Sequence, residues 1–450
     1  MRTRDAFEQS GRSGGGEQFE PVRRLLIDCT QTVATSRHAG IPRVVRNIIR
    51  HGSAAAAVHG AMMVPVRFED DHFLPLNLSL AGDLVDVVSR PSAGNTRPLL
   101  RRIRKLLGSM RIVREIGVQW RRLAAVPLRV QPVVFGPDDT LLLADSSWAT
   151  NYWHVVDAAR KVGARIGVIQ YDFIPHTHPE LGRKKLATTF RGWMTNTLKR
   201  ADFVAAISEA VAVEARAELR RMGRDPERAA PLVQAFRLGA DIKPASAAGP
   251  VRAELEAFVA ASPGGPYLTV GAIEPRKNQA VLPAVFEQVW KHVPEARLLM
   301  AGGVGWRGDE MLRRIHKHPR YGTHLMHFEN VTDAELVYAY GRARALIFPS
   351  LAEGYGLPIV ESLSHGMRVF ASDIPAHREV GGPWCVYFAP DDVTGLAEKI
   401  IALERHGTFQ AVAPEGAFPS PTWQQAVDQL MRIVFSGTAT DDCHGMRSAA

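Results

Sequence analysis

The sequence predicts an α/β protein made of two doubly wound domains, each with a parallel sheet that carries helices on both faces. Short, unbroken apolar runs alternate with helical patterns along the chain, which is typical of strands buried on both faces. A segment rich in Pro, Ala and Gly interrupts this alternation between Lys243 and Pro266, after which it restarts. At 450 residues the chain also exceeds the ~250–300 residues that one hydrophobic core usually covers.

The first domain is expected over residues 23–245, after a polar, Gly- and Ser-rich tail at 1–22. Its apolar runs predict strands over 25–28, 62–66, 140–145, 165–171 and 202–208. Helical patterns separate these runs at 42–52, 151–162, 179–200 and 209–222.

The second domain is expected over residues 246–420. Its apolar runs predict strands over 267–272, 297–303, 324–328, 345–350 and 368–373, with a helix over 279–290. Thr332 followed by Glu335 is the capping-box pattern that opens a helix. The amphipathic segment 421–436 predicts a helix that either closes the second domain or packs back onto the first, and 437–450 is a second tail.

The composition is that of a soluble globular protein, with 46% hydrophobic and 22% charged residues, and it excludes collagen, coiled coil and disorder throughout. No apolar run approaches the ~20 residues of a membrane helix, and the N-terminal tail lacks the apolar region of a secretory signal. The cysteines, Cys29, Cys385 and Cys443, have no metal-type spacing. We therefore expect a reduced, cytoplasmic protein with neither a disulfide framework nor a zinc site.

The net charge of +9 is concentrated in one segment. Between Arg97 and Arg129 there are ten basic residues and one acid, Glu115, so the rest of the chain is nearly neutral (+9 minus +9). Leu, Ile, Val and Trp residues interleave with the arginines, as in an interfacial helix. The segment 97–129 therefore predicts contact with an anionic membrane surface, and the alternative is the general Arg- and Ala-rich composition. No aromatic-interleaved RNA-binding motif accompanies it, so no nucleic acid is expected.

The stretch from Phe348 to Asp373 carries the most information about chemistry. A predicted strand ends at Ser350, a loop Glu353–Gly356 follows, and a helix begins with Pro358 at its first position. The loop glycines allow close approach of a ligand, and the helix N-terminus favours an anion or a hydroxyl. Since ligands of doubly wound sheets bind outside the carboxyl ends of the strands, this loop is the predicted binding site.

Charged residues of both signs are expected at the same edge. Glu353 and Glu361 invite a glycosidase interpretation, but a retaining glycosidase needs carboxyl groups ~5–5.5 Å apart that flank one bond. One acid on a loop and one inside a helix are better suited to separate hydroxyl groups of an extended ligand. Arg276 and Lys277 follow the first strand of the domain, where two cations suit a pyrophosphate.

These motifs resemble those of a known family. EGYGLPIVE (353–361) resembles the E-x7-E signature of the family 4 retaining nucleotide-sugar glycosyltransferases, and VGAIEPRKN (270–278) resembles their phosphate-binding segment. The first half is similar more loosely, for example in IDCTQTVATSRHAGIPRVVRNI (27–48) and VIQYDFIPHTHPEL (168–181). The chain looks most like the mannosyltransferase-like branch that assembles bacterial surface polysaccharides. The resemblance implies the GT-B fold, in which two Rossmann-like domains face a cleft.

The resemblance also implies roles for individual residues. Glu353 and Asp172 are the catalytic candidates, and Glu361 would hold the donor ribose. The donor-binding residues that it implies are Gly40, Arg43, Arg276, Lys277, Gly354, Tyr355, Gly356, Leu357 and Glu361. It implies no metal and no cofactor, because basic side chains and helix N-termini would offset the charge of the leaving group.

The sequence departs from the family pattern at two positions. Ala272 stands where many relatives carry Arg, so Arg276 or Arg43 would supply the second cation. Tyr171 stands where many relatives carry His before the Asp. Asp172 then becomes the best candidate for contact with the sugar, with a cap or loop acid as the equal alternative.

The function implied by the resemblance is a retaining, metal-independent hexosyltransferase. GDP-mannose is the favoured donor, with UDP-sugars second, and the acceptor is a hydroxyl of a glycan or lipid-linked oligosaccharide. Such an enzyme would work in the cytoplasm, peripherally on the inner face of the membrane. One alternative is a non-catalytic GT-B scaffold that binds a nucleotide sugar or glycan. The other is a polysaccharide phosphorylase of similar fold, which would need a Lys-bound pyridoxal phosphate.

Overall fold

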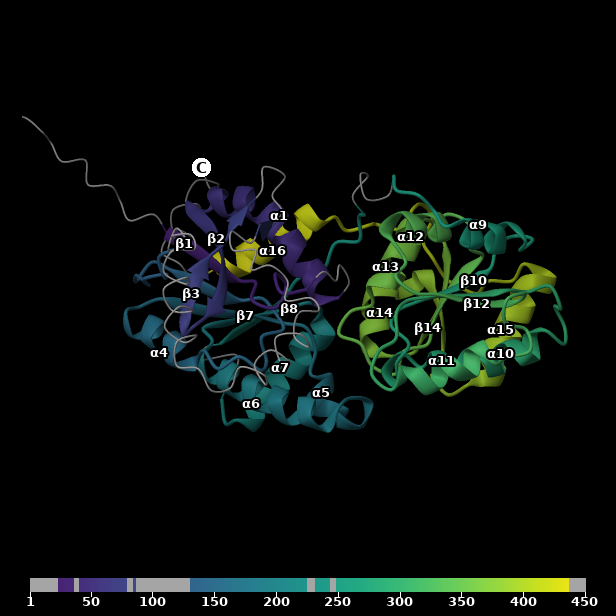
Figure 1. The fold of residues 1–450 in the computed structure, drawn as a ribbon, viewed down its shortest axis with the longest axis horizontal. Helices are drawn as coiled ribbons and strands as arrows, with labels where there is room; N and C mark the ends of the chain where they lie inside the picture. Colours follow the sequence, from purple (N-terminus) through teal and green to yellow (C-terminus); the bar gives the residue numbers. More distant parts are fainter. Residues whose placement is uncertain are drawn as a thin grey trace, which may run out of the picture.

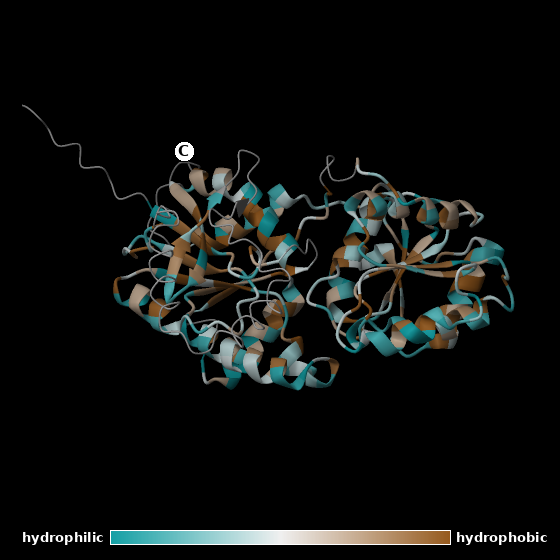
Figure 2. Cartoon of the chain, viewed as in Figure 1, coloured by the Kyte–Doolittle hydropathy of each residue, from teal (hydrophilic) through white to brown (hydrophobic). Residues whose placement is uncertain are grey.

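The computed structural model describes residues 23–35, 40–78, 84–85, 130–224, 231–242 and 248–436. These residues form two α/β domains that lie side by side (Figure 1). Each domain has a central sheet with its apolar strands inside and most polar residues on the outer helices (Figure 2). The predicted tails 1–22 and 437–450 and the basic segment 97–129 lie outside the described residues.

The first domain has a seven-stranded sheet in the order β3-β2-β1-β6-β7-β8-β9. Neighbouring strands are parallel except for the pair of β2 and β3. The five predicted strands of this domain are confirmed. The strands of the sheet are β1 (Arg23–Asp28), β2 (Ala61–Glu69), β3 (His72–Pro75), β6 (Thr140–Leu143), β7 (Arg165–Gln170), β8 (Phe203–Ala206) and β9 (Leu232–Ala235).

The edge strand β3 was not expected from the sequence pattern. It pairs with β2 through Glu69 and His72, and the two residues between them, Asp70 and Asp71, have φ of 49° and 63°. Two positive φ values in a two-residue loop are those of a type I′ hairpin turn, whose twist matches that of the strands. Strands β4 (Asn77–Leu78) and β5 (Leu84–Val85) form a separate antiparallel pair.

Helices cover both faces of the first sheet (Figure 1): α1 (Ile41–Val58), α4 (Trp153–Lys161), α5 (Ile174–Thr177), α6 (Lys184–Arg200) and α7 (Glu209–Arg221). Helix α1 is longer than predicted and contains Gly52. A Cβ at Gly52 would lie 2.5 Å from the sulfur of Met63, so the glycine allows α1 to pack closely on β2. The predicted helix over 179–200 is divided, because Pro179 opens a short 3-10 turn before α6 begins.

The second domain has a six-stranded parallel sheet in the order β12-β11-β10-β13-β14-β15. Alternate residues of its strands belong to two apolar clusters. Tyr267 belongs to the cluster that contains Phe286 and Leu396. Its neighbour Leu268 belongs to the other cluster, on the opposite face, with Phe258 and Ile359. The strands are β10 (Tyr267–Val270), β11 (Leu298–Ala301), β12 (Leu325–Phe328), β13 (Ala345–Phe348), β14 (Arg368–Ser372) and β15 (Cys385–Phe388).

Helix α12 of this domain begins where its capping residues predict, whereas α10 begins later than expected. Thr332 and Glu335 form the expected capping box at the start of α12. The predicted helix over 279–290 starts as a 3-10 turn and becomes α-helical at Leu282, next to Pro283. The helices are α9 (Ala253–Ala260), α10 (Leu282–Val289), α11 (Gly308–His316), α12 (Asp333–Tyr340), α13 (Leu357–Ser364), α14 (Pro375–Gly381) and α15 (Val393–His406).

The last helix, α16 (Trp423–Phe435), packs on the first domain beside α1 (Figure 1). The backbone amide of Trp423 donates to Asp241 (2.6 Å), and the amide of Ala240 donates to the carbonyl of Pro421 (2.9 Å). A Cβ at Gly239 would lie 2.3 Å from the Trp423 nitrogen, so only glycine fits beside the start of this helix. Of the two placements that the sequence allowed, the structure has the one on the first domain.

Within the described residues, no helix combines the length and the apolar character that crossing a bilayer requires.

Candidate functional site

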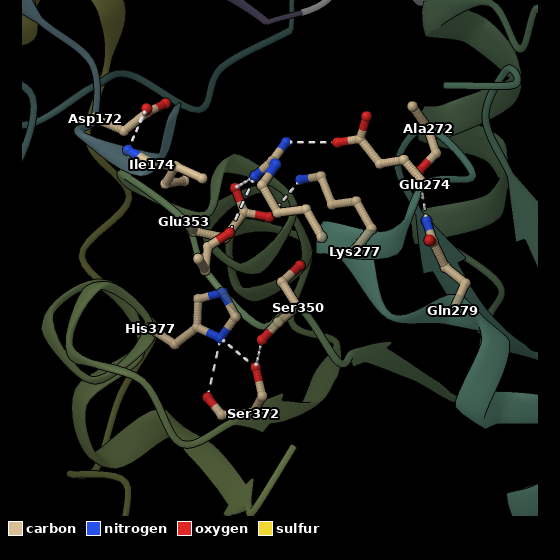
Figure 3. A network of polar contacts seen from close by, with 12 residues as sticks. Asp172, Ile174, Ala272, Glu274, Lys277, Gln279, Ser350, Glu353, Ser372 and His377 are labelled. Atoms are coloured by element: carbon tan, nitrogen blue, oxygen red, sulfur yellow. Dashed lines mark hydrogen bonds and ion pairs between the residues drawn. The ribbon is translucent and has the colours of Figure 1, made fainter. Parts of the chain in front are cut away.

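The carboxyl ends of β10 and β13 bring the predicted cations and Glu353 together (Figure 3). A 3-10 turn at Pro275–Lys277 follows β10, and the loop with Glu353 follows β13. Arg276 Nη1 donates to Glu353 Oε2 (2.7 Å), and Lys277 Nζ donates to Glu353 Oε1 (2.5 Å). Arg276 Nη2 also donates to Glu274 Oε1 (2.9 Å). Residues far apart in sequence therefore form one ion cluster at the sheet edge.

The ion cluster is buried and its charges depend on one another. Burial by itself would raise the pKa of Glu353, but Arg276 and Lys277 outweigh it and hold this pKa well below its usual value. Burial lowers the pKa of Lys277, although the Glu353 carboxylate opposes that effect. The Lys277 ammonium also lies 4.9 Å from the centre of the Phe348 ring. The cluster therefore provides two positive charges that already hold one carboxylate.

The loop between Glu353 and the next helix lies against the first domain. A Cβ at Gly354 would come within 1.9 Å of the Tyr171 carbonyl oxygen, so only glycine fits there. Ser208 Oγ donates to the Gly354 carbonyl (2.7 Å), and the Tyr355 hydroxyl donates to the Leu238 carbonyl (3.0 Å). The Tyr355 side chain is thus hydrogen-bonded to the first domain, so only the backbone of this residue could contact a ligand at the loop.

The loop ends at Gly356, which has φ of 118° and precedes the first residue of α13, Leu357. The helix begins one residue earlier than expected, so Pro358 is its second residue and not its first. Neither position requires an intrahelical amide donor, so the proline is equally well tolerated. The N-terminus of α13 accordingly lies beside the ion cluster.

Glu361 is buried inside α13, and both of its oxygens have partners. Oε2 accepts a hydrogen bond from the Tyr340 hydroxyl (2.7 Å). Oε1 accepts one from Arg43 Nη1 (2.5 Å), which belongs to α1 of the first domain. Gly40, with φ of 65°, precedes that helix. Arg43 therefore forms an ion pair with Glu361 and does not join Arg276 and Lys277 as a further cation of the ion cluster.

Asp172 and Tyr171 come from the carboxyl end of β7 and lie across from the loop. Asp172 Oδ1 accepts the amide of Ile174 (3.0 Å), as a loop acid does (Figure 3). Burial raises the pKa of Asp172, and the nearby Arg276 opposes this shift. The Tyr171 hydroxyl donates to the Ala144 carbonyl (2.7 Å) within its own domain, so it is not directed at the loop.

Residues 260–414 match the sequence profile of the family described as Glycosyl transferases group 1. The second domain is a group 1 glycosyltransferase domain. The match contains the whole ion cluster, the Glu353 loop and α13. The resemblance noted from the E-x7-E signature is thereby confirmed.

Curated relatives of this glycosyltransferase domain are named as mannosyltransferases. The serotype-specific mannosyltransferase WbdA of Escherichia coli is 31% identical over 315 residues, which are 67% of this chain and 38% of WbdA. The phosphatidyl-myo-inositol mannosyltransferase of Mycolicibacterium smegmatis is 33% identical over 167 residues, 36% of this chain and 42% of that protein. The chain thus spans less than half the length of these relatives.

Solved structures identify the fold as GT-B. Sucrose-phosphate synthase from Thermosynechococcus elongatus superposes with a TM-score of 0.54 at 16% identity, over 92% of this chain and 94% of that one. The Anabaena protein HepE in complex with UDP-glucose gives a TM-score of 0.52 at 13% identity, over 91% and 94%. At such identities the likeness concerns the fold alone.

The candidate site contains residues that the sequence did not single out. Gln279 Nε2 donates to the Ala272 carbonyl (2.8 Å) and braces the loop after β10. Tyr340 holds Glu361, and nothing in its sequence context indicated this. His377 lies fully buried just after β14, the position at which parallel sheets place functional residues, although no sequence motif marks it.

Among the residues that the structure describes, no group of three or more His, Cys, Asp or Glu side chains is arranged to hold a metal ion.

Proposed function

We propose that this chain is a retaining glycosyltransferase that moves a hexose from a nucleoside-diphosphate sugar to a hydroxyl of a glycan. The observation that carries the proposal is the ion cluster of Arg276, Lys277 and Glu353 beside the N-terminus of α13, inside a group 1 glycosyltransferase domain. Two cations next to a helix N-terminus suit a diphosphate. A non-catalytic scaffold of the same fold is the alternative.

The donor would bind by exchanging partners in the ion cluster. Its diphosphate would take Arg276 and Lys277 from Glu353, and the backbone amides between Gly354 and Leu357 would face the phosphate and sugar. The freed Glu353 would then accept hydrogen bonds from sugar hydroxyls. Because two cations offset the leaving-group charge, this chemistry would need no metal.

The nucleoside would lie further along α13. Glu361 would accept the ribose hydroxyls, and Tyr340 and Arg43 would orient its carboxylate. Because Arg43 is already on Glu361, it would act there and not as the second phosphate cation. Gly40 would allow the start of α1 to approach the donor.

In the transfer step, the bond between the anomeric carbon and the phosphate oxygen breaks, and the acceptor oxygen bonds to that carbon from the same face. The acceptor proton passes to the departing phosphate oxygen, so configuration is retained without a nucleophilic side chain. The protein would contribute positioning and charge stabilisation. Asp172, across from the loop on β7, would contact the acceptor or the donor sugar.

The donor and acceptor are proposed from the names of the relatives. Because WbdA and the phosphatidyl-myo-inositol enzyme are named mannosyltransferases, GDP-mannose is the favoured donor. A surface glycan or lipid-linked oligosaccharide would be the acceptor, reached at the cytoplasmic face of the membrane. The basic segment 97–129, outside the described residues, would provide the contact with anionic lipid.

A thermal-shift screen tests the donor, with GDP-mannose, UDP-glucose, UDP-GlcNAc and dTDP-rhamnose as probes. We expect GDP-mannose to stabilise the protein most and to be turned over in the presence of a mannan acceptor. Glu353→Ala should reduce kcat/KM by about 10³-fold or more while GDP still binds, because both cations remain. Glu398→Ala, an exposed acid of the same domain, is the control. Unchanged turnover in Glu353→Ala would overturn the assignment, and donor binding without turnover by the wild type would indicate the scaffold.

A further inference from the structure

A group of buried polar side chains lies behind Glu353, where β13 and β14 end (Figure 3). Ser350, Ser372 and His377 are each 0% exposed. Among the residues that the structure describes, two atoms of this group have no hydrogen-bond partner, namely His377 Nε2 and Ser350 Oγ. Buried polar atoms in folded proteins are nearly always paired, so two unpaired atoms in one group require an explanation.

The hydrogen bonds around His377 determine its protonation. Ser372 Oγ lies 2.6 Å from the Ser350 carbonyl and donates to it, since a carbonyl only accepts. His377 Nδ1 lies 3.0 Å from the Ser372 carbonyl, so Nδ1 must carry the proton. Burial lowers the pKa of His377 to about 4, which keeps the ring neutral at physiological pH. The second nitrogen, Nε2, is therefore an acceptor that lacks a donor.

The position of the ring directs this acceptor toward the proposed donor site. In Figure 3 the unbonded nitrogen is on the side of Glu353, opposite Ser372. The ring packs against Phe348, with the centroids 5.1 Å apart and the ring planes tilted by 42°. A Cβ at Gly356 would lie 3.4 Å from Cδ2 of the ring, so His377 directly adjoins the glycine that precedes α13.

The hydrogen-bonding capacities of the two unpaired atoms limit which chemical group can bind to both. Nε2 requires a hydrogen-bond donor, which excludes an ionised phosphate oxygen. Ser350 Oγ can donate as well as accept. A hydroxyl group both donates and accepts, and can therefore pair with both atoms.

We propose that His377 and Ser350 recognise one hydroxyl of the donor hexose and so contribute to the choice of sugar. The hydroxyl would donate to His377 Nε2 and accept from Ser350 Oγ. This inference rests on the proposed function and identifies two residues of its sugar site. It makes His377 a specificity-determining residue that acts on the sugar and not on the nucleotide.

Two substitutions distinguish the roles of the two ring nitrogens of His377. In His377→Asn the side-chain amide can still donate to the Ser372 carbonyl, but no atom remains at the place of Nε2. In His377→Gln the longer side chain can bring an acceptor oxygen to that place. His365→Asn is the matched control, because His365 Nδ1 also forms a hydrogen bond with a backbone carbonyl, that of Glu361 (2.8 Å).

The measurement compares GDP with GDP-mannose by calorimetry, and then kcat/KM for GDP-mannose with that for its four monodeoxy analogues. In the wild type we expect one analogue to lose about fivefold to tenfold in kcat/KM, as for a neutral hydrogen bond. His377→Asn should bind GDP normally, bind GDP-mannose about fivefold more weakly, and no longer discriminate against that analogue. Ser350→Ala should affect the same analogue, and the two effects should not add because they concern one hydroxyl.

His377→Gln should recover part of the discrimination, and His365→Asn should keep the wild-type ratio of GDP to GDP-mannose affinity. The inference is overturned if His377→Asn weakens GDP and GDP-mannose equally, or if it leaves the discrimination among the analogues unchanged. If the wild type binds neither GDP-mannose nor UDP-glucose, the proposed function itself fails, and this inference fails with it.

Discussion

The two domains place acids at the same edge of their sheets but satisfy them differently. In the first domain Asp28 ends β1 and Asp145 follows β6, and both are buried. Asp28 accepts the hydroxyl of Ser147 (2.9 Å), and Asp145 accepts the amides of Gln31 (2.9 Å) and Thr32 (2.6 Å), all from its own domain. These bonds tie the loop after β1 to the neighbouring strand.

In the second domain the acids are held by groups that a ligand can replace. Glu353 is paired with two cations, and Glu361 with a tyrosine hydroxyl and an arginine of the other domain. Phosphates can compete for cations, and hydroxyls can join a carboxylate, whereas a backbone amide stays where the chain places it. The strand ends thus support loop structure in one domain, whereas in the other they carry the groups proposed to bind the donor.

The largest effect is expected from the pH dependence of the first domain. Burial, with a contribution from Asp145, raises the pKa of Asp28 to about 6. The unfolded chain releases this proton near pH ~4, so the folded state binds more protons between these values. The free energy of unfolding should therefore fall by roughly 3 kcal/mol as pH rises from about 4 to above 6.

Urea denaturation of the wild type and Asp28→Asn between about pH 4 and 7.5 measures this effect. The asparagine variant should show a flatter dependence of stability on pH, and Asp391→Asn, an exposed acid, should follow the wild type. Parallel curves for the wild type and Asp28→Asn would argue against the role assigned to this buried acid.

A substitution at the sheet edge of the second domain should instead change the affinity for the donor. Lys277→Met removes one of the two cations proposed for the diphosphate, and a charge-assisted hydrogen bond contributes about 1.5–3 kcal/mol. The dissociation constant for GDP should therefore rise by about 10- to 100-fold, as measured by calorimetry. Lys291→Met, on the exposed surface, is the matched control. If Asp28→Asn weakened GDP binding as much as Lys277→Met does, the two sheet edges would not differ in the way proposed.

The smallest effect is expected at Glu361. Tyr340→Phe removes one hydrogen bond to this carboxylate without removing the acid, so GDP affinity should fall only about threefold. Tyr338→Phe is the control, since the Arg342 guanidinium lies over that ring, 4.1 Å from its centroid. A tenfold or greater loss in Tyr340→Phe would show that orientation of Glu361 matters as much as the phosphate cations.

The predictable part of the site follows from local pattern and the geometry of parallel sheets. Apolar runs located the strands, and the residues after them, Arg276, Lys277 and Glu353, had to meet because carboxyl ends of parallel strands share one edge. The contacts of Tyr340 and Arg43 with Glu361 were not predictable in this way. They depend on how a distant helix packs and how the two domains approach each other, and neither leaves a local signal.

The sequence by itself determined the two doubly wound domains, the sheet edge at which the chemistry is proposed and the resemblance of the Glu353 loop to a glycosyltransferase signature. Periodicity and short motifs are properties of neighbouring residues, so they can be read without the fold. The tertiary structure decided that α16 packs on the first domain and that Arg43 pairs with Glu361. It also decided that one nitrogen of His377 has no hydrogen-bond partner among the described residues. Each of these depends on contacts between residues far apart in the chain, whose geometry arises only when the helices and sheets pack.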